Sequence, residues 1–271
     1  MSIPARIFQT WKSKNVLPPN FDAWSASFDV QNPHYKHELW DDRDNRSFIS
    51  SDFPWFVPTY DEYPAEIYRA DAIRYFYLYK FGGIYADLDT ECLRSLDELL
   101  PLGDVVLGRM GTNPDFPHSI PNAIMASSPN QEFWVLVMAL LVWFAERFKN
   151  ARPEVLTGPV LLKRALDMYL TAYSTSALHF IGSLRDAFSL HRDSEKSRIT
   201  ILDNNSWFPL DWSNPVHQQL RRDILDGRDI ETKTKALIFP DAWMVTYWAH
   251  TWEEPQPRAP LTQRPHDSAM L

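Results

Sequence analysis

The stretch FGGIYADLDTE, residues 81–91, places two carboxylates two positions apart, directly after an apolar run that follows a pair of glycines. The run is typical of a buried strand, in which alternate side chains face the same way. Asp87 and Asp89 should therefore point together, whereas Leu88 points back toward the core. Two neighbouring carboxylates are costly to bury unless a cation neutralises them. The pattern fits a site for Mn²⁺ or Mg²⁺ with oxygen ligands. A bare D-x-D is common, however, and taken alone it more often marks a solvated acidic turn.

The helix expected just before this strand adds two more charged residues. The sequence YRADAIRYFYLYKFGG, residues 68–83, predicts a helix over 65–80 that ends at glycines able to adopt left-handed conformations. Asp71 and Arg74 are three positions apart, so they share a helical face, and a surface ion pair is the simplest interpretation. This helix carries aromatic residues on most sides, however, so a pair without a role would be buried at a desolvation cost. We expect the pair to line a polar cleft beside the D-x-D carboxylates.

The composition indicates one ordered domain. The 271 residues are 45% apolar and 14% aromatic, which is enough for a sizeable core. A formal charge of −8 argues against nucleic acid as a partner, because phosphate backbones need a basic face. The charge is compatible with a nucleoside diphosphate, whose own charge a bound metal can neutralise. Cys92 is the single cysteine, so no intrachain disulfide forms, and a reducing compartment is the simpler expectation.

No targeting or membrane-spanning segment is evident in the sequence. The N-terminal stretch MSIPARIFQTWKSKNV lacks the apolar core of a signal peptide. The longest apolar run, residues 133–145, is shorter than the ~20 residues that a bilayer span needs, and it predicts a buried helix instead. We expect a soluble, cytoplasmic protein. Peripheral membrane contact, or separation from an anchor, is the alternative.

Apolar runs and turn residues predict alternating strands and helices. Strands are expected over 7–10, 35–39, 83–87, 104–110, 121–128, 197–203 and 234–240, and helices over 65–80, 132–149 and 157–170. This alternation predicts an α/β fold with a mainly parallel sheet, whose ligand site lies beyond the carboxyl ends of the strands. We expect one domain over residues 1–252 and a disordered, Pro-rich tail over 253–271.

Residues 69–100, RADAIRYFYLYKFGGIYADLDTECLRSLDELL, resemble the sugar-nucleotide-binding region of a family of D-x-D glycosyltransferases. This is the family of the Och1-type and inositol-phosphoceramide mannosyltransferases, glycosyltransferase family 32, to which the clostridial glucosylating toxins look related. Shorter stretches, IPARIFQTWKS, NAIMASSPNQEFW, TGPVLL and TYWAHTW, are similar to other motifs of the family. The last one departs from its motif, because Thr246 or Tyr247 stands where a histidine is expected and only His250 lies nearby.

The resemblance implies a GT-A type, Rossmann-like fold and metal-dependent, retaining transfer of a hexose from a nucleotide-diphosphate sugar. GDP-mannose is the preferred donor and a UDP-hexose the alternative, with a glycan, a lipid headgroup or a natural product as acceptor. Asp87 and Asp89 would hold Mn²⁺ or Mg²⁺, and His250 is either a further ligand or a packing histidine. The residues assigned to catalysis are Asp71, Arg74, Asp87 and Asp89. Those assigned to donor binding are Gln9, Thr10, Trp11, Asp71, Arg74, Tyr85, Asp87 and Asn122.

Several of these assignments have alternatives that the sequence leaves open. Trp11 is equally a core residue, Asn122 is equally part of a turn, and Thr157 is more readily a helix cap than a catalytic group. The aromatic loops at 52–60 and 204–215 could clamp the acceptor, with core packing as the alternative. The whole chain is alternatively a noncatalytic module that binds nucleotide sugars or carbohydrates on the same fold. Retention of the full charged set favours the enzyme.

Overall fold

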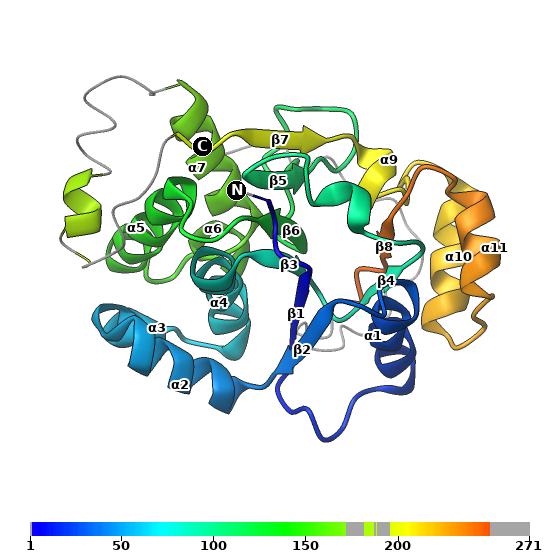
Figure 1. Cartoon of the computed structure of the whole chain (residues 1–271), viewed down its shortest axis with the longest axis horizontal. Coiled ribbons are helices and arrows are strands. Elements are labelled where there is room, and N and C mark those ends of the chain that lie inside the picture. The colour runs from blue at the N-terminus through cyan, green and yellow to red at the C-terminus, as the bar shows by residue number, and fades with distance from the viewer. Residues whose placement is uncertain (1, 172–181, 187, 189–195, 250–271) are drawn as a thin grey trace.

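The computed structural model describes residues 2–171, 182–186, 188 and 196–249. At its centre lies a six-stranded sheet in the order β2-β1-β3-β6-β5-β7 (Figure 1). Its strands are β1 (Arg6–Thr10), β2 (Lys36–Trp40), β3 (Gly83–Ala86), β5 (Val105–Gly108), β6 (Ile124–Ser127) and β7 (Ile199–Leu202). β1 is parallel to β2 and β3, and β5 is parallel to β7, whereas β6 is antiparallel to both of its neighbours. The predicted mixed, mainly parallel sheet is confirmed.

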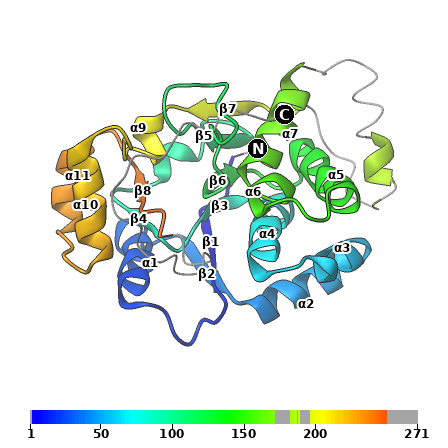
Figure 2. The same ribbon diagram turned by 180° about the vertical axis from the view of Figure 1, so that it is seen from behind.

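Helices lie on both sides of this sheet (Figures 1 and 2). One side carries α2 (Asp42–Asp52), η1 (Pro54–Phe56), α3 (Val57–Glu62), α4 (Glu66–Phe81), α5 (Glu132–Arg147), α6 (Pro153–Leu156) and α7 (Pro159–Thr171). The other side carries α1 (Pro19–Gln31), η2 (Asp97–Leu99), α9 (Asn204–Trp207), α10 (Pro215–Leu225) and α11 (Thr232–Ile238). It also holds a two-stranded antiparallel sheet of β4 (Thr90–Cys92) and β8 (Met244–Thr246).

The pleat of β3 divides the core between the two sides. Tyr85 packs into the cluster that contains the apolar faces of α4 and α5. Its neighbours Ile84 and Ala86 pack into the cluster on the other side of the sheet. The alternation continues beyond the strand, because Leu88 is buried in a third cluster with Phe21. Leu88 therefore points back toward the core, as the sequence predicted.

The glycine pair between α4 and β3 allows an abrupt reversal of the chain. Gly82 and Gly83 have φ angles of +64° and +101°, in the left-handed region that the sequence analysis anticipated. A Cβ on Gly83 would lie 2.6 Å from the carbonyl oxygen of Arg6 in β1, so only glycine fits there. The reversal sends β3 back along α4. As a result, Arg74 in the helix lies beside Asp87 at the end of the strand.

One predicted strand is wrong. Residues 234–240 lie mostly in α11 rather than in a strand, because the buried Lys235 of that helix pairs with Glu91 of β4, a partner that no local pattern reveals. The aromatic loop at 52–60 forms η1 and most of α3, and its aromatic side chains, such as Phe56, pack in the core. The predicted tail, 253–271, lies outside the described residues, and the domain limits stay a prediction.

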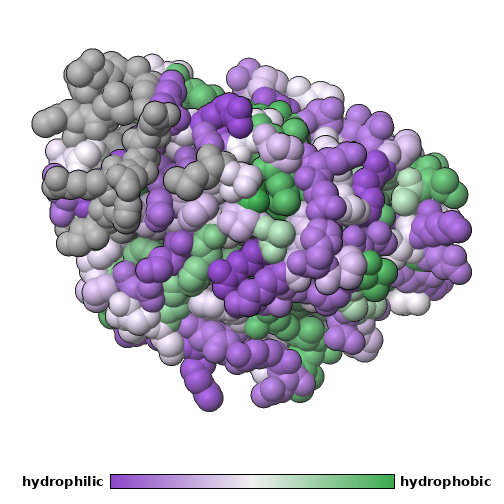
Figure 3. Space-filling view, in the orientation of Figure 1, coloured by the Kyte–Doolittle hydropathy of each residue, from purple (hydrophilic) through white to green (hydrophobic). Residues whose placement is uncertain are grey.

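The face of the molecule displayed in Figure 3 is mainly polar. Figure 3 shows hydrophilic residues around separate hydrophobic patches on the face that it displays. The long apolar run at 133–145 lies in α5, and most of its side chains face the core. Across the part of the chain that the structure describes, no helix combines the length and the apolar character that crossing a membrane requires.

Candidate functional site

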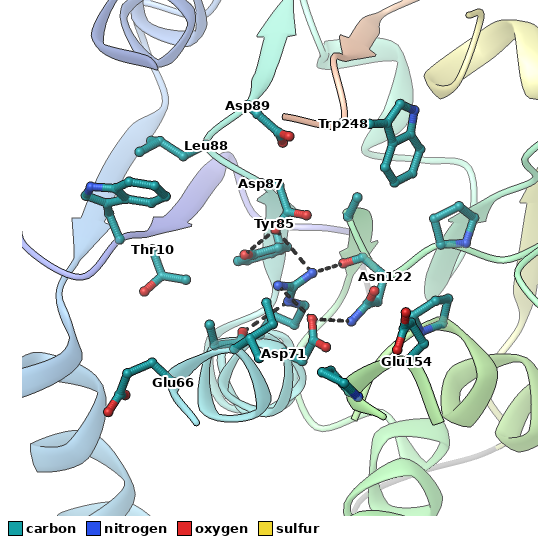
Figure 4. A pocket seen from close by; sticks show the side chains of 18 of the residues that line it. Thr10, Glu66, Asp71, Tyr85, Asp87, Leu88, Asp89, Asn122, Glu154 and Trp248 are labelled. Carbon is teal, nitrogen blue, oxygen red and sulfur yellow. Dashed lines mark hydrogen bonds and ion pairs between the residues drawn. The ribbon is translucent and has the colours of Figure 1, made fainter. Parts of the chain in front are cut away.

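A cavity of about 490 Å³ lies at the edge of the sheet where β1 and β3 end and β6 begins. The two parallel strands deliver Trp11 and Asp87 to this edge, and the segment before the antiparallel β6 delivers Asn122. Figure 4 shows Asp71, Tyr85, Asp87 and Asn122 near the centre, Thr10 and Leu88 on one side, and Glu154 and Trp248 on the other. This is the edge at which the sequence predicted a ligand site.

Arg74 of α4 contacts most of the polar residues at the centre of the cavity. Its Nη2 lies 3.0 Å from Asp71 Oδ1, and its Nη1 lies 3.1 Å from Asp87 Oδ1. Nη1 also donates to the carbonyl of Asn122 over 2.8 Å, and Asn122 Nδ2 donates to Asp71 Oδ1 over 3.0 Å. The guanidinium lies over the ring of Tyr85, whose hydroxyl donates to Asp87 Oδ1 over 2.8 Å. The Asp71–Arg74 pair is thus part of the cavity wall and not a surface ion pair.

The two D-x-D carboxylates line the same cavity. Asp87 uses Oδ1 for its bonds to the Tyr85 hydroxyl and the Arg74 guanidinium, and no described donor is bonded to its Oδ2. Asp89 accepts from the Thr246 hydroxyl over 3.3 Å and from the main-chain N–H of Ala249 over 2.7 Å. Both side chains offer oxygen atoms, which hard divalent cations prefer.

Two carboxylates do not complete the coordination of a metal. Within the described ranges, no group of three or more His, Cys, Asp or Glu side chains could hold a metal ion. A cation at the D-x-D pair would therefore need further oxygen ligands from water and from a bound molecule such as a diphosphate. His250, the further candidate ligand of the sequence analysis, lies outside the described residues.

Burial and charge act against each other at the centre of the cavity. Burial raises the pKa of Asp71 and of Asp87 to about 6 in each case, although the Arg74 guanidinium opposes the shift. Burial also raises the pKa of Asp89, against the hydrogen bond from Ala249. For Arg74, burial acts to lower the pKa, but the carboxylate of Asp87 above all raises it beyond its ordinary value. Arg74 pairs with two of these three carboxylates, so negative charge is in excess here, which favours a cation.

The turn between α6 and α7 fixes the Asp71 carboxylate from behind. Thr157 Oγ1 donates to Asp71 Oδ2 over 3.2 Å, and the Tyr75 hydroxyl donates to the carbonyl of Thr157 over 2.8 Å. A Cβ on Gly158 would lie 3.1 Å from Asp71 Oδ2 and 2.9 Å from the Cα of Glu154. The T-G-P sequence is therefore more than a helix boundary. It allows this turn to pack directly against the carboxylate.

Trp248 lines the cavity on the side away from Thr10 (Figure 4), and the sequence analysis did not single it out. Its φ of +51° is uncommon for a residue other than glycine. Arg221 of α10 holds this conformation, because its Nε donates to the carbonyl of Tyr247 over 2.6 Å and its Nη2 donates to that of Trp248. The next N–H, that of Ala249, then reaches Asp89. The only signal in the sequence was the motif TYWAHTW.

The predicted residues near the N-terminus take two different places. Thr10 and Trp11 line the cavity, and the Trp11 ring also packs edge-on against Phe21 at 5.1 Å, so this tryptophan serves both the core and the cavity. Gln9 is fully buried behind the cavity wall. Its Nε2 lies 3.4 Å from the carbonyl oxygen of Asp87, so it supports the D-x-D turn from behind.

The part of the chain that supplies the central charged residues of this cavity matches a known family. Residues 20–105 match the description "glycosyltransferase sugar-binding region containing DXD motif". This chain carries a DXD glycosyltransferase region. The region includes Asp71, Arg74, Asp87 and Asp89, which are the four residues that the sequence analysis assigned to catalysis.

Two yeast proteins are similar to most of this chain. Inositol phosphoceramide mannosyltransferase 3 of Schizosaccharomyces pombe is 34% identical over 212 residues, 78% of this chain and 57% of the relative. Mannosyl phosphorylinositol ceramide synthase CSH1 of Saccharomyces cerevisiae is 30% identical over 208 residues, 76% of this chain and 53% of the relative. The chain thus spans somewhat more than half the length of these relatives. The resemblance to the inositol-phosphoceramide mannosyltransferases is confirmed.

A solved structure is similar in fold. The match to the PaToxG glycosyltransferase includes 70% of this chain and 79% of the PaToxG chain. Its TM-score is 0.50 and the sequence identity is 19%. At this identity the likeness concerns the fold alone. Together with the mixed sheet and its flanking helices, it confirms the expected GT-A type fold.

Proposed function

We propose that this chain transfers a hexose from a nucleotide-diphosphate sugar to an acceptor hydroxyl and retains the anomeric configuration. The observation that carries this proposal is the buried cluster of Arg74 with Asp71 and Asp87 in a cavity of about 490 Å³, a volume ordinary for small-molecule sites. The names of the two yeast relatives, one of them a mannosyltransferase, support mannose as the sugar. GDP-mannose is the proposed donor and a UDP-hexose the alternative.

The oxygen atoms at the D-x-D pair fit a hard divalent cation. Asp87 and Asp89 would hold Mn²⁺ or Mg²⁺, with diphosphate oxygens and water as the remaining ligands. When bound, the cation stabilises the negative charge that develops on the leaving diphosphate. Asp87 Oδ2, which no described donor bonds, is the oxygen best placed to serve as a ligand.

The end of the cavity at Thr10 is proposed to take the nucleoside. Trp11 offers an aromatic surface to a base, and the adjacent Lys12, which also lines the cavity, offers a positive charge to a phosphate. Gln9 acts through the carbonyl of Asp87 and does not touch the donor. Asp71 and Arg74 lie next along the cavity, so the proposal assigns the hydroxyls of the donor sugar to them.

Asp71 is better suited to holding a sugar than to attacking it. Its Oδ1 is bonded by Arg74 and Asn122, and its Oδ2 by Thr157. A carboxylate with both oxygens bonded in this way is a weakened nucleophile. We therefore infer front-face transfer. The acceptor oxygen forms its bond to the anomeric carbon on the face from which the diphosphate leaves, and the acceptor proton goes to the leaving phosphate oxygen. A covalent glycosyl adduct on Asp71, trapped and seen by mass spectrometry, would overturn this step.

The experiment that tests the proposal follows the anomeric carbon of the donor. Purified protein is incubated with GDP-mannose and Mn²⁺, without any acceptor, and released mannose is followed by NMR. The proposal expects slow release of the α-anomer first. Arg74→Lys should lower the rate by roughly 10²-fold, because the fixed contacts to both carboxylates are lost, whereas the control Arg147→Lys, on the exposed end of α5, should not change it.

The same experiment separates the proposal from the noncatalytic alternative. A module that only binds nucleotide sugars would retain GDP-mannose without releasing mannose. Release of the β-anomer first would contradict retention while leaving the transferase assignment intact. No release from GDP-mannose or from any of three UDP-hexoses (glucose, galactose and N-acetylglucosamine) would refute the proposed function.

A further inference from the structure

The side of the cavity away from Trp11 carries polar groups that the proposed donor does not use. Glu154 of α6 and His118, from the loop between β5 and β6, both line the cavity, and Trp248 completes this side. Figure 4 shows Glu154 and Thr10 on opposite sides, with Asp71 between them. If the nucleoside occupies the Thr10 end and the donor sugar lies at Asp71, the space beside Glu154 is where the attacking molecule enters.

One oxygen of Glu154 is buried without a partner. Its Oε1 accepts a hydrogen bond from Arg152 Nη2 over 2.8 Å. Its Oε2 is a buried atom and has no hydrogen-bond partner among the described residues. Buried carboxylate oxygens are normally bonded, because leaving one without a donor is costly. Glu154 as a residue lines the cavity, so a ligand hydroxyl beside it can supply the missing donor when the carboxylate turns toward the cavity.

The main chain holds Glu154 at a fixed place beside the donor-sugar carboxylate. Gly158 separates the two, since a Cβ on it would lie 2.9 Å from the Cα of Glu154 and 3.1 Å from Asp71 Oδ2. The N–H groups of Thr157 and Gly158 both donate to the carbonyl of Pro153 over 2.9 Å, which closes the turn around Glu154. A molecule bonded to Glu154 is therefore adjacent to a sugar bonded to Asp71.

His118 supplies a second polar group on the same side. It is partly buried, stacks on Phe116 at 5.4 Å, and neither ring nitrogen has a hydrogen-bond partner among the described residues. Burial lowers the pKa of His118, although the carboxylate of Glu154 opposes the shift, so the neutral form of the ring is favoured. A neutral imidazole offers one donor and one acceptor, which again suits a hydroxyl.

The charges near Glu154 do not suit a phosphate. Among the described residues that line the cavity, the side chains capable of positive charge are Lys12, Arg74 and His118. Lys12 follows Trp11 at the opposite end, and Arg74 is paired with two carboxylates. Burial favours the neutral form of His118. The cation nearest to Glu154 is Arg152, which already pairs with its carboxylate over 2.8 Å. An anionic group beside Glu154 would therefore have to compete with that carboxylate for Arg152.

We infer that Glu154 and His118 form the acceptor subsite and bind hydroxyls of an uncharged sugar or polyol ring. This inference rests on the proposed function for the meaning of "acceptor". The ring could be the end of a glycan or the polyol of a lipid headgroup. In either case, the part that enters the cavity carries free hydroxyls and no phosphate.

The test measures binding of soluble probes without any nucleotide, so that it does not depend on donor turnover. Saturation-transfer NMR titrations use methyl α-D-mannopyranoside, myo-inositol and myo-inositol 1-phosphate on the full chain. The inference expects binding of at least one of the two uncharged probes and weaker binding of the phosphate than of myo-inositol. Glu154→Gln should lower the affinity for the bound probe by about tenfold, which corresponds to the loss of a hydrogen bond to a charged group. Glu62→Gln, an exposed control in α3, should not change it.

Each result of the titrations either supports or overturns the subsite. Binding of the mannoside points to a glycan end, and binding of myo-inositol points to a headgroup polyol; both support the subsite. Unchanged binding in Glu154→Gln, no binding of either uncharged probe, or tighter binding of the phosphate than of myo-inositol would overturn it. A thermal melt of Glu154→Gln shows whether that variant is folded. The second variant, His118→Gln, should also weaken binding of the probe. Failure of donor hydrolysis, measured separately, refutes the proposed function and leaves the probe result standing by itself.

Discussion

Replacing Lys235 with methionine should destabilise the protein severely and weaken the D-x-D site. Lys235 of α11 is 1% exposed and pairs with Glu91 Oε2 at 2.5 Å and with Asp229 at 2.7 Å. Glu91, which is also buried, lies in β4 and accepts a hydrogen bond from the Tyr247 hydroxyl over 2.6 Å. The substitution removes the ammonium and leaves the Glu91 carboxylate buried without its cation.

The expected loss follows from the burial of both partners. Breaking a buried ion pair costs about 3–5 kcal/mol, because one charge stays desolvated. At about 2–4 °C per kcal/mol for a chain of this size, the melting temperature should fall by roughly 6–20 °C. The matched control is Arg228→Met, because the Arg228 guanidinium is 63% exposed where it pairs with Asp223. That loss should be far smaller than the loss in Lys235→Met, because solvent screens an exposed pair. Urea unfolding and thermal melts measure both variants.

The double variant Glu91→Gln/Lys235→Met distinguishes the buried charge from lost packing. It should regain part of the stability, because no uncompensated carboxylate remains. The D-x-D site should also respond, since Glu91 follows Asp89 by two residues and Tyr247 precedes Trp248, so affinity for a nucleotide sugar should fall in Lys235→Met. A loss below about 1 kcal/mol in Lys235→Met would refute the account of a buried pair that joins α11 to β4.

Three further predictions concern Asp71 and the fold. Thr157→Val leaves Asp71 Oδ2 without its hydroxyl donor and should cost about 1–3 kcal/mol in urea unfolding, whereas Thr157→Ser should cost less than half as much; equal losses would contradict the hydrogen bond. The pKa of Asp71 is raised from 3.8 to about 6 by burial, so the folded state binds its proton more tightly than the unfolded state. The stability of the metal-free wild type relative to Asp71→Asn should therefore be highest below pH 4 and fall as the pH rises through about 6, and a difference that does not vary with pH would contradict this. Gly83→Ala, where a Cβ meets the Arg6 carbonyl oxygen at 2.6 Å, should cost more than about 3 kcal/mol, whereas Gly111→Ala, with open space around its Cβ, should cost about 1 kcal/mol; similar melting temperatures would refute the close approach.

The centre of the fold was predictable because its signals are local. The glycine pair, the apolar strand and the D-x-D carboxylates follow one another within residues 81–91, and each restricts the chain in a way that a short window reveals. The pairing of Asp71 with Arg74 also follows from helical spacing. The ion pair between Arg74 and Asp87 could not be predicted from spacing, because it forms only when the chain reverses at the glycines and places the two residues side by side.

The rest of the site depends on contacts between distant segments. Thr157 reaches Asp71 across 86 positions of the chain, so its spacing suggested no more than a helix boundary. Lys235 lies in an apolar run that resembles a strand, and its helix is stabilised by Glu91, 144 positions away. Trp248 is positioned by its hydrogen bond from Arg221 and by the pairing of β8 with β4. No single window contains both members of any of these pairs.

The most direct test of the account is calorimetric titration of GDP-mannose into the wild type and into Asp89→Asn, each with Mn²⁺ and with EDTA. The exposed Asp115→Asn serves as the control. The account predicts binding to the wild type and to the control in Mn²⁺, loss of that binding in EDTA, and at least about tenfold weaker binding in Asp89→Asn. Equal binding with Mn²⁺ and with EDTA, or equal binding by Asp89→Asn and the wild type, would contradict the claim that the D-x-D pair holds a cation for the donor.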